Sequence, residues 1–357
     1  MKIAVVTVHD SANFGSFLQA YALNEVLKSM GHKVYFLQTR DKNYVRKLYY
    51  DFTIDREAVL HPFRFLKRNW FGIKKYRLFL KEQQCFLEAE EYEALNPDMV
   101  ILGSDEIWNI KTPVFTNSIF YGAGMQNVIA YAVSVGLAEE EDFAHNSFLS
   151  NAIKKIPVIF ARDDKTARCV AKITGELPDV ICDPTFLLDI EQYSRPYHNQ
   201  YLQEHEYLLV YTYAPDQKTQ KILREFAKKY RLKLVSVCFY YDWCDYNIIC
   251  SPLEFCQIIK GARYVITTTF HGTIFSILNQ KRFVSVPLSQ KTIDVIWRVG
   301  LENKIIQFDD LNLQILEEKL FRNDYRYHEV NKKIEQMRSH SFNLLKKNIE
   351  VYRNDNM

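Results

Sequence analysis

Short apolar runs alternate with helix-like segments along the first half of the chain. Lys2–Val8 is continuously apolar, which is typical of a strand buried on both faces of a parallel sheet. After a polar loop, apolar residues spaced four apart mark one face of a helix that ends at Gly31, and His32–Leu37 resumes as a strand. This order predicts a parallel sheet whose loops gather at the strand C-termini. Three later runs extend the sheet: Met99–Leu102, Val128–Val133 and Val158–Ala161.

A second alternation of strands and helices begins after a polar stretch at 191–206. Strands are expected at Tyr207–Tyr213, Leu232–Val237, Tyr264–Thr268 and Phe283–Val286, and helices at Gln217–Tyr230, Pro252–Ile259 and Gly272–Leu278. The amphipathic spacing after residue 325 predicts one or two further helices.

The two alternations predict an α/β fold with two Rossmann-like, doubly wound domains that face each other across a cleft. We expect the N-terminal, acceptor-side domain at 1–195, the C-terminal, donor-side domain at 196–325 and a helical segment at 326–357. Small anions are expected in the cleft, because helix N-termini present free N–H groups and a partial positive charge there.

A basic and aromatic segment at 64–81 interrupts the first alternation. Seven Lys and Arg residues are interleaved there with Phe, Trp and Tyr. One interpretation is a helical excursion with a solvated basic face. The other is an amphipathic surface that meets anionic lipid headgroups or a polyprenyl-diphosphate sugar, which would give the protein peripheral membrane contact.

Composition narrows the class of protein. The chain is 48% hydrophobic and 25% charged, which is typical of a soluble globular protein. Its net charge of +3 is too small to indicate a nucleic-acid partner. The sequence starts directly on a strand-like run and has no apolar stretch long enough to span a bilayer. We therefore expect a cytoplasmic protein, with any membrane contact at the inner face.

The cysteines favour reduced thiols over a metal site. None of the seven forms a C-x-x-C pair. Cys244, Cys250 and Cys256 recur every six residues, but structural zinc sites have tighter spacing and no His lies nearby.

The first candidate motif, Asn13–Leu23, joins the first strand to the first helix. Gly15 permits a tight turn, and Asn13 and Ser16 can cap the helix or bind a ligand. Gln19 belongs to the same motif. The G-x-G-x-x-G pattern of dinucleotide sites is missing, so NAD is not indicated.

The second motif places Gly103, Ser104 and Asp105 at the end of a strand, followed by Trp108. Asp105 could accept a proton from a sugar hydroxyl or orient it, and Trp108 could stack on a sugar face. Alternatively, Asp105 is only the N-cap of a following helix.

The third motif places Arg162 just beyond the apolar strand Val158–Ala161. A guanidinium there suits a carboxylate or phosphate better than it suits core packing. The alternative is an ion pair with the adjacent Asp163 or Asp164.

The fourth motif is the most informative. The β-branched strand at 264–268 runs into Thr269, and His271 follows with Gly272 and Thr273 at a helix start. An imidazole among convergent N–H and O–H donors suits acid catalysis beside an anion.

Together, in this order, the motifs resemble the polysaccharide pyruvyl transferase family. The resemblance runs from Val5 to about Gly300. The order and spacing of the motifs, taken together, are more specific than any single motif. Its marks are Asn13–Leu23, Gly103–Asn109, Tyr131–Gly136, Arg162 with Asp163, Cys182–Thr185 and Phe270–Thr273.

The resemblance implies a fold similar to the glycosyltransferase B type, phosphoenolpyruvate as donor and a sugar acceptor for surface polysaccharide synthesis. By similarity, His271 matches the catalytic acid, and Arg162 matches an Arg that holds the donor. Relatives with an Arg-Leu-His-Gly motif carry a second donor-binding Arg where this chain has Thr269. Lys281, Arg282, Lys291 and Arg298 are the candidates to replace it.

The donor chemistry needs no redox cofactor and no obligatory metal. Protonation of C3 makes C2 of phosphoenolpyruvate electrophilic, two sugar hydroxyls attack in turn, and phosphate leaves. His271 would supply the proton, and Asp105 would act as base for the hydroxyl. The acceptor sugar and its attachment to a lipid are not readable from the sequence. Two alternatives remain: a nucleotide-sugar glycosyltransferase of the same fold type, and a non-catalytic protein of polysaccharide assembly.

Overall fold

A computed structural model describes residues 1–54, 56–89, 91–322 and 326–355. The first half holds a six-stranded parallel sheet in the order β3-β2-β1-β4-β5-β6. Its strands are β1 (Lys2–Val6), β2 (Lys33–Leu37), β3 (Leu87–Ala89), β4 (Met99–Leu102), β5 (Val128–Val133) and β6 (Val158–Ala161). Its α-helices are α1 (Phe14–Ser29), α2 (Lys42–Lys47), α3 (Arg56–Leu60), α4 (Pro62–Gln83), α5 (Tyr92–Leu95), α6 (Glu140–Ala144), α7 (Ser147–Lys154) and α8 (Asp164–Thr174).

The second half holds a five-stranded parallel sheet in the order β11-β10-β7-β8-β9. Its strands are β7 (Tyr207–Tyr211), β8 (Lys233–Val237), β9 (Tyr246–Ile248), β10 (Tyr264–Thr267) and β11 (Phe283–Ser285). Its α-helices are α9 (Gln200–Glu204), α10 (Gln217–Lys229), α11 (Phe255–Gly261), α12 (Phe270–Leu278), α13 (Gln290–Val299), α14 (Leu313–Phe321) and α15 (Tyr327–Asp355). Short 3₁₀ helices lie at η1 (Pro113–Thr116), η2 (Ser118–Tyr121), η3 (Pro184–Phe186), η4 (Ile190–Tyr193) and η5 (Glu302–Lys304).

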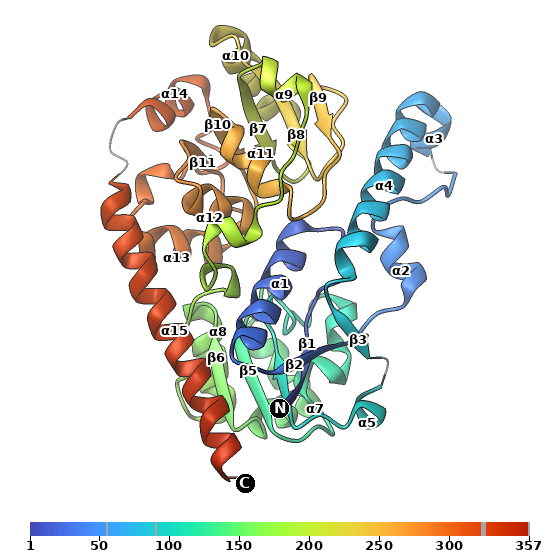
Figure 1. The fold of residues 1–357 in the computed structure, drawn as a ribbon. Coiled ribbons are helices and arrows are strands. Elements are labelled where there is room, and N and C mark those ends of the chain that lie inside the picture. The colour runs from blue at the N-terminus through green and yellow to red at the C-terminus, as the bar shows by residue number, and fades with distance from the viewer. Residues whose placement is uncertain (55, 90, 323–325, 356–357) are drawn as a thin grey trace.

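The predicted α/β class with two parallel sheets is confirmed (Figure 1). The central strands are buried along their whole length, as their continuous apolar runs predict. Two three-residue edge strands, β3 and β9, were not predicted, because so short a pairing leaves no periodic signal. Helix α11 begins at Phe255 rather than Pro252, because residues 252–254 form a tighter turn in which the Phe255 amide donates to the Pro252 carbonyl.

The C-terminal segment is one helix, α15, which returns from the second half to the first (Figure 1). At its start, the Tyr327 hydroxyl donates to the carbonyl of Lys281 at 2.5 Å. Further along, the Ser341 hydroxyl accepts from the amide of Cys182 at 2.9 Å, and Arg338 donates to Phe186 O at 2.7 Å. Helix α15 therefore ties the two halves together on one side. No helix in the described ranges is long and apolar enough to cross a membrane.

Candidate active site

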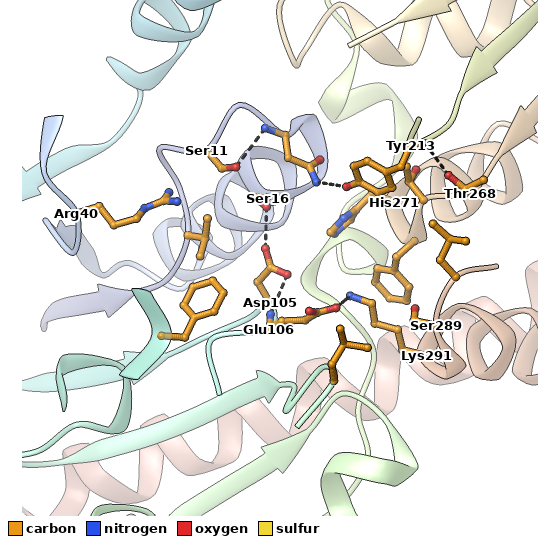
Figure 2. Close-up of a pocket in the computed structure, with 17 residues that line it drawn as sticks. Ser11, Ser16, Arg40, Asp105, Glu106, Tyr213, Thr268, His271, Ser289 and Lys291 are labelled. Atoms are coloured by element: carbon orange, nitrogen blue, oxygen red, sulfur yellow. Dashed lines mark hydrogen bonds and ion pairs between the residues drawn. The ribbon is translucent and has the colours of Figure 1, made fainter. Parts of the chain in front are cut away.

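A cavity of about 370 Å³ lies between the two halves, at the C-terminal ends of both sheets (Figure 2). The loop after β1 and the turn after β4 form one wall, and the loops after β7, β10 and β11 form the other. Its polar lining comes from Ser11, Asn13, Ser16, Arg40, Asp105, Glu106, Tyr213, Thr268, Thr269, His271, Ser289 and Lys291. The structure thus brings most of the sequence motifs to one place.

His271 lies in the first turn of α12, on the cavity wall. Thr269 is the N-cap of this helix, and its hydroxyl accepts from the Gly272 amide at 2.9 Å. A Cβ at Gly272 would lie 2.2 Å from the Thr267 hydroxyl, so the turn needs glycine there. His271 Nε2 lies 3.7 Å from Asp183 Oδ2, so the imidazole ring has an acidic partner on its buried side.

Gly15 makes room for the imidazole. A Cβ at this position would lie 2.0 Å from His271 Nδ1. Gly15 belongs to the first turn of α1, so its role is close approach to His271 rather than the tight turn that we predicted. The N-termini of α1 and α12 therefore meet at the histidine, each with a partial positive charge.

Asn13 links the N-terminus of α1 to the second half. Its Oδ1 accepts from the Gly15 amide at 2.8 Å and from the Tyr211 hydroxyl at 3.2 Å. Its Nδ2 donates to the Tyr213 hydroxyl at 3.0 Å (Figure 2). Asn13 is thus both the predicted cap and a bridge across the cleft.

Asp105 presents its carboxylate to the cavity from a left-handed backbone position, with φ of 83°. Ser16 Oγ donates to its Oδ2 at 2.8 Å (Figure 2). Burial opposes ionisation, but the charges of Arg162 and Lys291 outweigh it and hold the pKa of Asp105 below its usual value. The alternative interpretation as a helix N-cap is wrong, because turns and the 3₁₀ helix η1 follow Asp105.

Arg162 lies behind the cavity wall, beneath the ring of Phe270. Its Nη1 is 3.1 Å from Asp183 Oδ2 and 3.6 Å from Asp105 Oδ1, and its Cζ is 4.8 Å from the Phe270 ring centre. It lines a separate cavity of about 20 Å³, and its Nε and Nη2 have no hydrogen-bond partner among the described residues.

The alternative ion pair of Arg162 with its sequence neighbours is wrong. Asp163 instead caps α8 by accepting from the Thr166 amide at 2.8 Å. Asp164 pairs with Arg298 at 2.8 Å, and Arg298 does not line the cavity.

Asp183 is the central residue that sequence reasoning missed, although it belongs to the Cys182–Thr185 motif. It accepts from Arg162 and faces His271. Burial alone would raise the pKa of Asp183, but His271 and Arg162 hold it well below its usual value. A carboxylate ahead of a proline, after the last strand of the first sheet, was the available signal.

Two cations line the cavity, and only one was among the predicted candidates. Lys291, in the first turn of α13, pairs with Glu106 across the cleft (Figure 2). Arg40, in the loop after β2, pairs with Asp10, and its Nε has no hydrogen-bond partner among the described residues. Arg40 was missed because nothing in its local pattern sets it apart; only the fold brings it to the cleft.

Three predicted contact residues lie away from the cavity. Trp108 is fully buried, donates to Phe120 O at 2.9 Å and stacks on Tyr121, so it packs in the core instead of meeting a sugar. Lys281 and Arg282 precede β11, at the opposite edge of the sheet, where Lys281 Nζ donates to Lys260 O at 2.9 Å. These two cations therefore cannot replace the second Arg of the relatives.

Three other predicted residues support the site from behind without lining it. Gln19 accepts from the Ser104 amide at 3.2 Å and donates to Ser16 O at 2.9 Å. The Thr273 hydroxyl donates to the carbonyl of Thr269 at 3.0 Å. Gln19, Ser104 and Thr273 are all fully buried, so they hold the loops in place.

None of the seven cysteines lines the 370 Å³ cavity. All seven are free thiols, and burial raises the pKa of Cys182 to about 12. Within the described part of the chain, no three His, Cys, Asp or Glu side chains gather where they could hold a metal ion.

Comparison with known proteins identifies the family. A family model described as polysaccharide pyruvyl transferase matches residues 13–290, which is most of the chain. No curated protein matches the sequence significantly.

Several solved structures share the fold at very low sequence identity. S. aureus MnaA, solved with UDP, has a TM-score of 0.57 at 12% identity, covering 99% of this chain and 97% of its own. The UDP-GlcNAc 2-epimerase of Neisseria meningitidis, bound to UDP-GlcNAc, has a TM-score of 0.56 at 10% identity, covering 98% and 100%. The spinosyn forosaminyltransferase SpnP has a TM-score of 0.51 at 10% identity, covering 99% of both chains. The expected similarity to the glycosyltransferase B type is confirmed.

Proposed function

The chain belongs to the polysaccharide pyruvyl transferase family, and on that premise we propose that it moves a pyruvyl group from phosphoenolpyruvate to two hydroxyls of a sugar. The product is a cyclic ketal on a surface polysaccharide or on its lipid-linked precursor. The observation that carries the proposal is His271, held between the N-termini of α1 and α12 on the wall of a cavity with cations on both sides.

The donor carries a carboxylate and a phosphate, and the cavity offers charge for both. Lys291 and Arg40 line it, and the N-termini of α1 and α12 add partial positive charge. Lys291 takes the place of the second Arg that relatives carry at the position of Thr269. Glu106 holds the Lys291 ammonium at the cavity edge until the donor arrives.

The first step is proton transfer from the His271 imidazolium to C3 of the donor. The electron pair of the C2–C3 double bond takes the proton, which leaves C2 electrophilic. Asp183, which pairs with Arg162, faces Nε2 of the ring from behind, and its negative charge offsets the positive charge of the imidazolium before transfer.

A sugar hydroxyl then attacks C2, the bond from C2 to the phosphate oxygen breaks, and the second hydroxyl closes the ketal. The two hydroxyl protons balance the reaction: one restores His271 and the other leaves with phosphate. The charges of Arg162 and Lys291 lower the pKa of Asp105, which keeps its carboxylate ionised beside the attacking hydroxyl. It orients the hydroxyl together with Ser16 and offsets the positive charge at C2.

Donor binding tests the proposal without knowledge of the acceptor. Phosphoenolpyruvate should raise the melting temperature of the protein, and UDP-N-acetylglucosamine should not. The Lys291→Gln variant should bind phosphoenolpyruvate about tenfold to a hundredfold more weakly, as expected for the loss of a charged hydrogen bond. Lys281→Gln is the matched control on the far edge of the sheet.

Two results count against the proposal. Stabilisation by the nucleotide sugar alone would favour a glycosyltransferase. Phosphate release that is unchanged in His271→Gln, with phosphoenolpyruvate and a panel of hexosides, would remove the histidine from the chemistry.

A further inference from the structure

A protrusion between β2 and β3 is not used by the proposed reaction. It comprises α2, α3 and α4, and its outer end stands away from both sheets (Figure 1). We call this outer end the α3–α4 tip. Its exposed apolar side chains are Ile54, Val59, Leu60, Phe63, Leu66 and Trp70.

These side chains are large and open to solvent. Phe63 is 82% exposed, Ile54 79% and Trp70 54%. Phe63, Leu66 and Trp70 follow one another at spacings of three and four, so they share one face of α4. Scattered exposed apolar residues are ordinary, but a contiguous group at the end of a projecting helix marks a contact surface.

A basic stripe continues the same face of α4 toward the body of the protein. Lys67, Lys74, Arg77 and Lys81 are exposed and fall on this face by helical spacing. Lys74 Nζ lies 3.8 Å from the centre of the Trp70 ring. The one acidic residue of α4, Glu82, is buried and pairs with Arg195, so no acidic side chain within the helix neutralises the stripe.

The opposite face of α4 is fixed to the protein. Phe71 and Phe79 are buried, and Lys75 Nζ donates to the carbonyl of Cys238 at 2.9 Å. Near the tip, Asn69 Oδ1 accepts from the Asp51 amide at 2.9 Å. The solvent-facing side chains are therefore presented on a rigid support, so little conformational entropy is lost when they bind a surface.

We propose that the α3–α4 tip docks on the surface of an anionic lipid bilayer. Phe63, Leu66 and Trp70 enter the boundary between headgroups and acyl chains, where Trp is favoured. The basic stripe meets the anionic headgroups beside them. An apolar end next to a stripe of one charge sign fits a bilayer better than an ordinary protein interface, whose centre is depleted in charge.

The docked tip and the cavity share one stretch of chain. The protrusion starts next to Arg40 in the cavity wall, and the Tyr49 hydroxyl donates to the carbonyl of Ser11 at 2.9 Å. Docking would therefore hold the cavity near the membrane. That a lipid-linked sugar reaches it there rests on the proposed function, whereas docking itself does not.

Vesicle co-sedimentation of the full chain, without substrate, tests the docking. Vesicles of phosphatidylcholine mixed with phosphatidylglycerol should sediment the protein, and vesicles of phosphatidylcholine alone should bind it much less. Binding should weaken as salt rises, because screening shortens the reach of the basic stripe.

Paired variants separate the tip from general surface effects. Phe63→Ser with Trp70→Ser should lower binding at least tenfold, and Phe148→Ser with Trp297→Ser, exposed elsewhere, should not. Lys67→Glu with Lys74→Glu should lower it by a similar factor. Lys221→Glu with Lys228→Glu, which have the same spacing on α10, should leave it within about twofold.

Three outcomes would overturn the docking. The first is equal sedimentation with and without phosphatidylglycerol, and the second is equal loss in the tip and control variants. The third is a wild-type dimer that becomes a monomer on Phe63→Ser and Trp70→Ser, measured by light scattering, because the tip would then be a contact between copies.

Each variant is used only if its circular dichroism and melting temperature match the wild type. Donor binding should be unchanged in all of them, so failure here leaves the proposed function intact.

Discussion

At the scale of single residues, the site depends on the position of one imidazole ring. His271 lies between Gly15, where a Cβ would come within 2.0 Å of Nδ1, and Asp183, 3.7 Å from Nε2. Any side chain at Gly15 would move the ring, and loss of the Asp183 carboxylate would remove the acidic group that faces Nε2. Both contacts can be tested without changing the histidine.

Gly15→Ala should lower kcat by at least about a hundredfold, because a shift of the imidazole by about 1 Å is enough to cost that much. Alanine is favoured over glycine inside helices, so the backbone of α1 gives no reason for loss. Phosphate release from phosphoenolpyruvate with a reactive hexoside measures the effect, with thermal melting as the control. Wild-type kcat in a folded variant would show that His271 does not need this position.

Asp183→Asn should lower the free energy of unfolding by about 3–5 kcal/mol, because it leaves Arg162 buried without its closest charge. The pKa of Asp183 is lowered by folding, so its ionisation stabilises the protein above about pH 4 and this stabilisation is lost as pH falls. Urea unfolding across acidic pH should therefore show a shallower pH dependence in the variant. An equal slope would contradict the lowered pKa.

At the scale of elements, the N-cap of α12 fixes where the helix starts and how His271 is presented. The Thr269 hydroxyl accepts from the Gly272 amide, and the Thr273 hydroxyl donates to the Thr269 carbonyl. Thr269→Ala should cost about 1 kcal/mol of unfolding free energy and also lower kcat, whereas Thr269→Ser should retain both. Chemical denaturation and phosphate release check the pair. If alanine and serine behaved alike, the cap would not matter.

Helix α15 joins the two halves, and Arg338 is its main polar contact with the first half. Arg338 donates to Phe186 O at 2.7 Å and to Leu188 O at 3.2 Å, and pairs with Asp189. Arg338→Ala should lower the free energy of unfolding by about 1–3 kcal/mol, because it leaves these carbonyls unsatisfied.

Lys346→Ala, in an exposed pair with Glu350 on the same helix, is the control and should change the unfolding free energy by less than about 0.5 kcal/mol. Denaturant titration compares the two variants. Similar values for both would mean that Arg338 does not anchor α15.

At the scale of the whole molecule, the sequence predicts the features that depend on a local pattern of residues, such as strands and turns. The strands β4, β5 and β6 have the bounds that their apolar runs predict, and His271 lies at the cleft as its turn indicated. The sequence could not predict contacts between residues that are far apart along the chain and are brought together by folding. Arg40 joins the site only through the fold, and Trp108 is apolar core although its motif reaches the cavity. Asp183 lies in one of the sequence motifs, but only the fold shows that it faces His271. Lys281 and Lys291 look equivalent in sequence, yet Lys281 precedes strand β11 and Lys291 follows it, so they lie at opposite ends of the strand.

The central claim is that His271 delivers a proton to C3 of phosphoenolpyruvate while the pyruvyl group moves to a sugar. Mass spectrometry of hexosides incubated with the protein and phosphoenolpyruvate in heavy water tests it most directly. We predict a pyruvyl ketal with one deuterium in its methyl group from the wild type and no ketal from folded His271→Gln. A ketal made equally well by His271→Gln, or phosphoenolpyruvate consumed without any deuterium in the methyl group, would contradict the claim.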